Sequence, residues 1–216
     1  IKEVDFSKLS FGRTFADHMF ICEYKDGKWQ NPTIKPYGAL SLEPSASVFH
    51  YGQAVFEGMK AYKDDNGHVF LFRPQENYKR INKSCERLAM PAFPEEWFDK
   101  ALRTLVDIDS EWIKPGFGNA LYLRPFVIAT TPGVQASPAK DYLFIIITAP
   151  VQSYYSGDVR VKIADYYSRA ANGGFGFAKA AGNYAGQFYP TQQAAAEGYQ
   201  QVMWTDDATH QFLEEA

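Results

Sequence analysis

The sequence contains few cysteines and no long hydrophobic segment. Its 216 residues include only Cys22 and Cys85, which are far apart and lack the spacing of metal ligands. The longest largely apolar run, at 143–151, is much shorter than a membrane span and is typical of a buried strand. The first residues also lack the basic and then apolar pattern of a secretory signal, so we expect a reducing, cytoplasmic setting.

An excess of positive charge is also missing. The formal net charge is -3 at pH 7, and no basic patch stands out along the chain. Nucleic acids and anionic membrane surfaces are therefore poor candidates for partners, and we expect a small-molecule ligand. Aromatic residues are abundant, with 14 Tyr and 17 Phe, and could line a pocket or fill a β-rich core.

The first two thirds of the chain alternate between strand and helix patterns. Alternating residues around Asp26-Gly27 and around Asn66-Gly67 predict two β-hairpins. Helical spacing of apolar residues predicts one helix over 75–89 and an amphipathic helix over 94–113. Two strands, at 119–130 and 141–150, then follow around a loop rich in Pro, Gly and Ser.

The last third changes character after about residue 155. A short strand is expected within 159–165, an alanine-rich helix over 183–197 and a further strand within 199–206. Gly198 closes that helix, and Pro190 should kink or split it. We place a domain boundary between about 155 and 175, so the chain is expected to be a mixed α/β protein of two domains.

One lysine stands in unusual surroundings. Lys179 lies in the segment GGFGFAKAAGNYAGQFYP (173–190), where no other residue is charged. A lysine normally needs water or an acidic partner, and the small residues on both sides would let backbone or a bulky ligand approach closely. Two interpretations stay open from the residues alone: a functional amine in a site, and a lysine whose chain reaches from a loop to solvent.

Three stretches resemble the signature blocks of one enzyme family. They are HYGQAVFEGMKAY (50–62), LFRPQENYKRI (71–81) with LYLRPF (121–126), and KAAGNY (179–184). In this order they are similar to the branched-chain amino acid aminotransferases, class IV aminotransferases that depend on pyridoxal 5'-phosphate (PLP). The resemblance implies fold type IV, related to D-amino-acid aminotransferase, which combines α+β and α/β character.

The resemblance also implies a domain division. Residues 1–156 would form a small N-terminal α+β domain, 157–172 a linker, and 173–216 the beginning of a larger pseudo-barrel domain that binds the cofactor. Family members run well past the last residue of this sequence, so we expect the large domain to continue beyond it. This division is carried by the family alone.

The cofactor residues are assigned by the same resemblance. Lys179 would form the Schiff base with PLP and shuttle the proton, a role that needs a mostly neutral amine. Arg80 would bind the phosphate, and Tyr184 the phenolic oxygen of the cofactor. An acid must sit beside the pyridine nitrogen, and the pattern favours Glu215 over Glu214, with a slip of one residue left open.

The substrate pocket must accept both a branched aliphatic side chain and a carboxylate. By resemblance Arg124 would meet the carboxylate, and strand alternation places it on the same face as Tyr122. Aromatic walls would complete the pocket. The resemblance implies that they come from Phe56, Tyr122 and Tyr154, with Tyr51 reaching in from a neighbouring subunit.

We therefore expect a transaminase that moves the amino group between leucine, isoleucine or valine and 2-oxoglutarate. No metal site is expected, and the active form would be a homodimer or a higher homo-oligomer. Two alternatives share the fold, D-amino-acid aminotransferase and aminodeoxychorismate lyase. An alternative of another class is a non-catalytic binding protein on the same scaffold.

Overall fold

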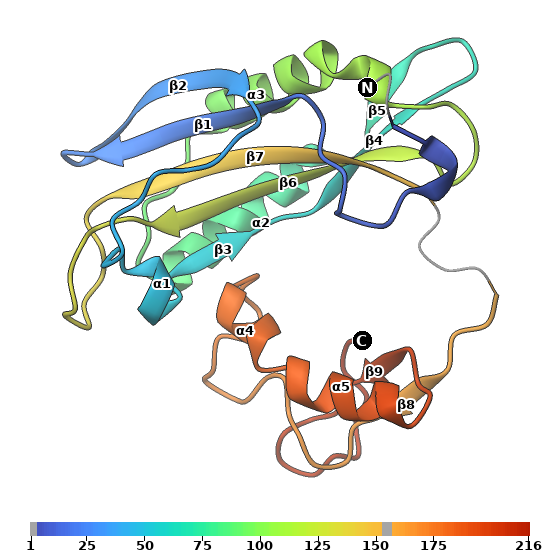
Figure 1. Ribbon diagram of the computed structural model, residues 1–216. Helices are drawn as coiled ribbons and strands as arrows, with labels where there is room; N and C mark the ends of the chain where they lie inside the picture. Colours follow the sequence, from blue (N-terminus) through green and yellow to red (C-terminus); the bar gives the residue numbers. More distant parts are fainter. Residues whose placement is uncertain (1–3, 153–156) are drawn as a thin grey trace.

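The computed structural model describes residues 4–152 and 157–216 of the chain, and its larger part is built on a seven-stranded sheet (Figure 1). The strands are β1 (His18–Lys25), β2 (Lys28–Pro36), β3 (Ala54–Phe56), β4 (Met59–Lys63), β5 (Val69–Leu71), β6 (Ala120–Ala129) and β7 (Tyr142–Val151). They lie in the order β2-β1-β7-β6-β4-β5, and β3 also pairs with β6. Every pairing in this sheet is antiparallel.

Both predicted hairpins are confirmed. β1 and β2 meet around Asp26 and Gly27, whose φ angles of 53° and 77° are both positive, as a tight hairpin turn of this hand requires. β4 and β5 pair from Ala61 opposite Leu71 to Lys63 opposite Val69. The two central strands β6 and β7 also form as predicted, within two residues at each end.

The break between β3 and β4 places several side chains that matter below. β3 pairs with the second half of β6, and β4 pairs with its first half. Between them the Glu57 N–H donates to the Pro125 carbonyl at 2.7 Å. Pro125 has no N–H of its own, so it fits in β6 at the point where the partner strand changes.

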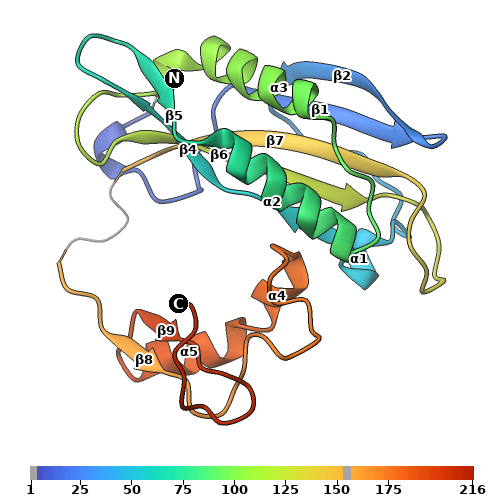
Figure 2. The same ribbon diagram turned by 180° about the vertical axis from the view of Figure 1, so that it is seen from behind.

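Two helices cover one face of the sheet, α2 (Pro74–Arg87) and α3 (Glu95–Ile108) (Figure 2). The second helix was predicted to run to residue 113, and this is wrong, because α3 ends at Ile108. The Asp109 side chain is buried, accepts from the His18 N–H and pairs with His18 Nδ1 at 2.7 Å. This long-range pairing draws the chain out of the helix, and the short 3-10 turn η2 (Ser110–Trp112) follows.

The core between the helices and the sheet contains many of the aromatic residues. Phe93 and Phe144 stack at 3.8 Å between ring centroids, and Phe20 and Phe98 pack edge-on against Phe144. Burying each such ring contributes about 1.5–3 kcal/mol relative to leaving it exposed. Of the two uses open to the aromatic residues, these four rings fill a core.

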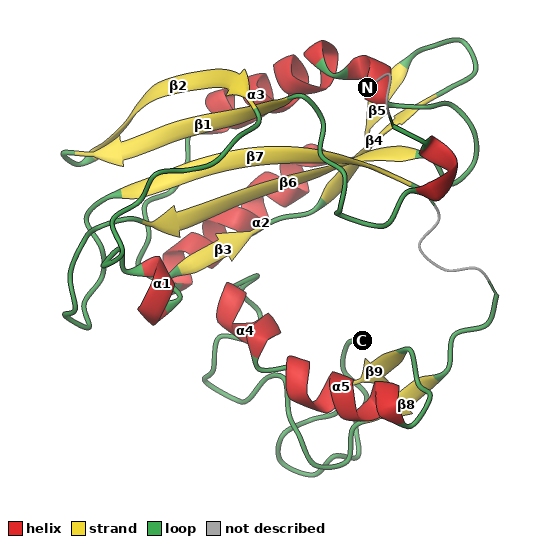
Figure 3. Ribbon diagram, viewed as in Figure 1, coloured by secondary structure: helices red, strands yellow, loops and turns green. Residues whose placement is uncertain are grey.

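The last part of the chain forms a smaller layer below the sheet (Figures 1 and 3). It holds the parallel pair β8 (Val161–Ile163) and β9 (Gln201–Met203), with the helices α4 (Ala181–Ala185) and α5 (Phe188–Ala196). The predicted single helix is split, as expected, but the break precedes Pro190, which lies in the first turn of α5 where its missing N–H costs nothing. Gly198 follows the helix with φ +84°, also as predicted.

The remaining short elements are η1 (Phe6–Lys8) and α1 (Val48–Tyr51), which precedes β3. Among the residues that the structure describes, none of the helices has the length and apolar character that crossing a membrane requires. The observed architecture agrees with the predicted mixture of α+β and α/β elements.

Candidate active site

The backbone of Lys179 is attached to the sheet layer. Its carbonyl accepts the Phe56 N–H at 3.0 Å, and the next residue, Ala180, forms a β-bridge with Val55. Ala178 and Ala180 are buried in the main core cluster, so the flanking side chains anchor the segment while the lysine side chain stays partly exposed. The small residues around Lys179 therefore serve close backbone packing.

The glycine-rich loop before Lys179 is compact. Gly173 has φ +75°, and a Cβ at Gly176 would overlap the side chain of Ala170. The Asn183 amide donates to the carbonyls of Phe175 and Ala178, which holds the loop against the first turn of α4. Glycine at these positions thus lets the chain turn tightly and present the lysine at a defined place.

The Lys179 amine faces aromatic groups. Nζ donates to Tyr184 Oη at 2.7 Å and lies 4.8 Å from the ring centroid of Phe56. Within the described parts of the chain, no carboxylate lies at ion-pair distance from this amine. A lysine half-buried against aromatic rings and a phenol is suited to chemistry rather than to a surface salt bridge.

Arg80 is held by a carboxylate that the sequence analysis missed. Glu57 is fully buried, and its two oxygens accept Nε and Nη2 of Arg80, the second contact at 2.9 Å. Asn77 Nδ2 and the Gly58 N–H also donate to Glu57 Oε2. The Arg80 pKa is raised, first by the hydrogen bond to Glu57 and further by the charges of Glu57, Tyr184 and Glu215, against an opposing effect of burial.

A signal for Glu57 was present in the sequence. It is the only acid in the block HYGQAVFEGMKAY, among apolar residues of a short strand pattern. An acid in such a place needs a cationic partner when it is buried. Glu57 and Arg80 are 23 residues apart, which is too far for a local sequence pattern to relate them.

Glu215 pairs with an arginine that lies near Tyr184. Its Oε1 is 2.6 Å from Nη1 of Arg169, whose guanidinium lies 5.9 Å from the Tyr184 ring and also donates to the Gly176 carbonyl. The Glu215 carbonyl accepts the Trp204 N–H, which fixes this terminal stretch beside β9. Glu214 donates its N–H to the Trp204 carbonyl, and no side-chain partner of Glu214 occurs among the described residues.

Arg124 and Tyr122 project from β6 on one face, as strand alternation predicts. Arg124 Nη2 donates to Tyr122 Oη at 2.8 Å, and its guanidinium carbon lies 4.5 Å from the Phe56 ring centroid. Phe56 also packs on Tyr184 at 4.7 Å, so this ring lies between the Arg124 and Lys179 groups. The buried Arg124 Nε has no hydrogen-bond partner within the described residues.

The fit around Tyr122 depends on a glycine. A Cβ at Gly58 would overlap Tyr122 Oη, so only glycine admits the tyrosine in its observed position. Phe11 contacts Tyr122 edge-on at 5.1 Å. A cleft of about 370 Å³ opens beside this group, with Phe15, Tyr122 and Arg124 among its lining residues. Neither Phe11 nor Gly58 was singled out from sequence, because both act through residues distant along the chain.

Two of the predicted site residues are not part of this cluster. Tyr51 lies in α1, is partly exposed, and donates its hydroxyl to the Val134 carbonyl in a distant loop. Tyr154 lies outside the described residues. Of the other seven predicted residues, five are joined by contacts that meet at Phe56 and Tyr184, and Arg80 and Glu215 are linked to Tyr184 through the effect of charge on the Arg80 pKa. The seven are Phe56, Arg80, Tyr122, Arg124, Lys179, Tyr184 and Glu215.

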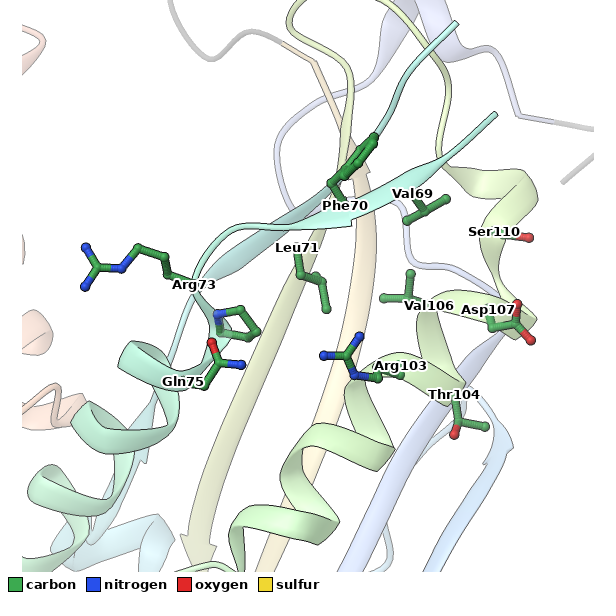
Figure 4. A pocket seen from close by; sticks show the side chains of 11 residues that line it. Val69, Phe70, Leu71, Arg73, Gln75, Arg103, Thr104, Val106, Asp107 and Ser110 are labelled. Carbon is green, nitrogen blue, oxygen red and sulfur yellow. The ribbon is translucent and has the colours of Figure 1, made fainter. Parts of the chain in front are cut away.

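A larger cleft lies elsewhere. Its volume is about 850 Å³, and Figure 4 shows its lining side chains on β5, the start of α2 and the second half of α3. Arg73 and Arg103 line it, but each guanidinium already has a carboxylate partner, Glu76 or Asp99. Lys179 and Arg124 are not in its lining. Size alone therefore does not identify the reactive site of this chain.

The two cysteines are unsuited to nucleophilic chemistry. Burial raises the pKa of Cys22 to about 11 and that of Cys85 to about 12, so both thiols stay protonated near neutral pH. No group of three or more potential metal ligands is found within residues 4–152 and 157–216. The reactive groups of the cluster are thus the lysine amine, the phenols, the guanidinium groups and the carboxylates.

The chain is similar in sequence to known aminotransferases. The chain is 49% identical over 216 residues to branched-chain-amino-acid transaminase 1 of Bacillus subtilis and 41% identical over 220 residues to the branched-chain-amino-acid aminotransferase of Mycolicibacterium smegmatis. These alignments cover 98% and 100% of this chain, and 61% and 60% of the relatives. The chain thus spans about three fifths of the length of these relatives.

Solved structures share the fold at lower identity. A branched-chain amino acid aminotransferase from Thermobaculum terrenum, in its PLP-form, superposes with a TM-score of 0.67 at 17% identity, over 90% of this chain and 60% of that one. The enzyme from Escherichia coli also gives 0.67, at 22% identity, over 89% and 59%. The predicted fold type IV is therefore confirmed. Residues 54–214, which hold Lys179, Arg80 and Arg124, match the amino-transferase class IV family, and the chain belongs to it.

Proposed function

We propose that the complete protein is a transaminase for branched-chain L-amino acids. It would transfer the amino group of leucine, isoleucine or valine to 2-oxoglutarate, giving the branched-chain 2-oxo acid and L-glutamate. The observation that carries the proposal is the Lys179 amine, held 2.7 Å from Tyr184 Oη on an aromatic surface. The relatives from Bacillus subtilis and Mycolicibacterium smegmatis bear names for this activity and support it.

The residues present fit pyridoxal 5'-phosphate as the cofactor. Lys179 would hold its aldehyde carbon, Tyr184 its phenolic oxygen, Arg80 its phosphate and Glu215 its pyridine nitrogen. When bound, this cofactor supplies an electron sink for the carbanion at the substrate α-carbon. The fit rests on an amine without a competing carboxylate in the described chain and on a guanidinium already oriented by Glu57.

The chain's own groups would divide the remaining work. The Lys179 amine would move the proton at the substrate α-carbon, because an amine can accept a proton and the Arg124 guanidinium on the other side of Phe56 cannot. Phe56 and Tyr122 would bind an aliphatic side chain. Arg124, whose Nε is buried without an acceptor in the described chain, would bind the side-chain carboxylate of glutamate or 2-oxoglutarate.

The assembly and the domain division belong to the same proposal. We infer a homodimer or higher homo-oligomer, in which the exposed Tyr51 would reach the pocket of a neighbouring subunit, and Tyr154 would contribute to the pocket wall. Residues 1–156 would be the small domain, 157–172 the linker, and 173–216 the beginning of the large domain. A cytoplasmic location is consistent with the two free cysteines.

The first experiment uses the complete protein and its Lys179→Ala variant. Each is mixed with PLP, reduced with borohydride and mapped by peptide mass, and the visible spectrum is recorded before and after addition of L-leucine. We expect covalent label on the Lys179 peptide of the wild type and conversion to pyridoxamine phosphate with leucine. Lys79→Ala, on the exposed face of α2, is the matched control and should keep both signals.

Equal labelling of wild type and Lys179→Ala would refute the role of Lys179. A substrate panel then separates the related enzymes of this fold. Amino transfer from D-alanine in place of L-leucine would indicate a D-amino-acid aminotransferase, and release of pyruvate from aminodeoxychorismate a lyase. PLP binding without turnover of any amino acid would contradict the enzymatic proposal altogether.

A further inference from the structure

One buried hydroxyl connects the two halves of the proposed cofactor site. Ser84 lies on α2, one turn after Arg80, and is 1% exposed. Its Oγ donates to the Arg80 carbonyl at 2.9 Å and accepts the Lys179 N–H, also at 2.9 Å. The second bond spans 95 residues and joins the helix layer to the lysine segment.

The geometry leaves Lys179 little freedom at its backbone. Its N–H is bound by α2 through Ser84, and its carbonyl is bound by β3 through Phe56. The Arg80 side chain is fixed separately by Glu57, which lies next to Phe56 in the chain. The positions of the Lys179 amine and the Arg80 guanidinium therefore both depend on α2 and on β3 with Glu57, the residue that follows it.

We propose that Ser84 is a positioning residue that holds the Lys179 amine and the Arg80 guanidinium in register for one ligand that carries both an aldehyde and a phosphate. The inference rests on the proposed function, and it extends that function to a residue that touches neither ligand group. An amine and a guanidinium held at a fixed spacing bind a ligand that carries both an aldehyde and a phosphate far more tightly than either group binds the aldehyde or the phosphate alone.

A serine in a helix often donates to the carbonyl four residues earlier for local reasons only. The hydrogen bond to the Arg80 carbonyl alone would have that local explanation. The bond from Lys179 is different, because it uses the remaining acceptor capacity of the hydroxyl for a partner in another layer of the fold. Register, rather than helix stability, is what this second bond controls.

The test compares Ser84→Ala with wild type in the complete protein. Three probes are titrated: pyridoxal 5'-phosphate, pyridoxal without phosphate, and inorganic phosphate. We expect the affinity for pyridoxal 5'-phosphate to fall about 30-fold. The affinities for pyridoxal and for inorganic phosphate should each change by less than about 3-fold, because only a ligand that binds Lys179 and Arg80 at once depends on the spacing between them. The control is Ser47→Ala, a buried serine whose hydroxyl has no partner among the described residues, and it should leave all three affinities unchanged.

A uniform loss for all three probes would overturn the proposal, because it would indicate local collapse, and an unchanged affinity for pyridoxal 5'-phosphate would overturn it too. If Ser84→Ala does not fold, Ser84→Cys serves instead. Its thiol is a weaker acceptor, so the selective loss should persist at a smaller size, and its absence would refute the role. If the wild type itself fails to take up the cofactor at Lys179, the proposed function fails rather than the role of Ser84 alone.

Discussion

The two arginines of the site are held in opposite ways. The Arg80 guanidinium is bound by the buried carboxylate of Glu57 through two of its nitrogens. The Arg124 guanidinium lies against the rings of Phe56 and Tyr122, bonds the phenol of Tyr122, and keeps a buried Nε without an acceptor in the described chain. The Arg80 cation is therefore ion-paired and fixed in orientation, whereas the Arg124 cation has no acidic partner in the described chain and one buried N–H without an acceptor.

This contrast matches the demands of the proposed reaction. A phosphate that stays bound through every cycle is best met by a cation that is already oriented. A substrate site that accepts a carboxylate in one half-reaction and an aliphatic chain in the other benefits from a cation on aromatic walls, where both can pack. The two environments thus suggest a permanent ligand at Arg80 and alternating ligands at Arg124.

The largest effect is expected where the pairing of Arg80 is broken. Arg80→Ala leaves Glu57 as a buried charge, and we expect a loss of about 2–3 kcal/mol in the free energy of unfolding, below the value of about 3–5 kcal/mol for a fully buried pair because Arg80 is half exposed. Adding Glu57→Leu should restore much of it. Urea denaturation measures both, and Arg103→Ala, which breaks an exposed pair with Asp99, should cost no more than about 1 kcal/mol. Equal losses in the free energy of unfolding for Arg80→Ala and Arg103→Ala would show that the Arg80–Glu57 pair stabilises the protein no more than an exposed pair.

A selective effect is expected at Arg124. Arg124→Ala should raise the KM for 2-oxoglutarate about 30-fold and that for leucine less than about 3-fold. The reason is that only 2-oxoglutarate has a side-chain carboxylate that loses its charged hydrogen bond to Arg124. Steady-state kinetics with both substrates measure the split. Arg124→Lys keeps the charge but not the planar fork, so it should recover part of the affinity for 2-oxoglutarate. An equal loss for both substrates would contradict the assigned role.

A smaller effect is expected at the glycine beneath Tyr122. Gly58→Ala should cost about 1–2 kcal/mol of stability, because its Cβ overlaps Tyr122 Oη and the ring must shift away from Arg124. Thermal unfolding measures the loss. Tyr122→Phe removes the overlapping oxygen, so the double variant should recover part of it. Gly38→Ala is the matched control, since its Cβ would meet open space.

The smallest effect concerns the loop that leads to Glu215. The Asp206 carboxylate accepts N–H groups of Phe212, Thr209 and Gln211, and these hydrogen bonds lower its pKa well below the usual range. A lowered folded-state pKa contributes stability that is present above the unfolded pKa of about 3.9 and is lost as the pH falls. Asp206→Asn should therefore lower the unfolding midpoint at pH 7 and have a diminishing effect toward pH 3. The neighbouring Asp207, whose carboxylate accepts no hydrogen bond within the described residues, is the control, and Asp207→Asn should leave the unfolding midpoint at pH 7 unchanged.

Local patterns predicted most elements of the fold but not all of their ends. The hairpin at Asp26-Gly27 and the split near Pro190 follow from residues that act on their own backbone. The end of α3 at Ile108 does not, because it depends on a bond between the buried Asp109 and His18, 91 positions earlier. Periodicity reports the buried face of a helix and carries no information on such a partner.

The sequence by itself determined most of the strands and helices, the tight turns and the isolated lysine, because hydrophobic periodicity, glycine, proline and charge act over a few residues. Only the tertiary structure decided that Glu57 holds Arg80, that Ser84 binds the Lys179 backbone, and that Phe56 lies between the Lys179 and Arg124 groups. These contacts join residues 23 to 123 positions apart. Their formation depends on how the strands pair and how the layers pack, which no short window of sequence contains.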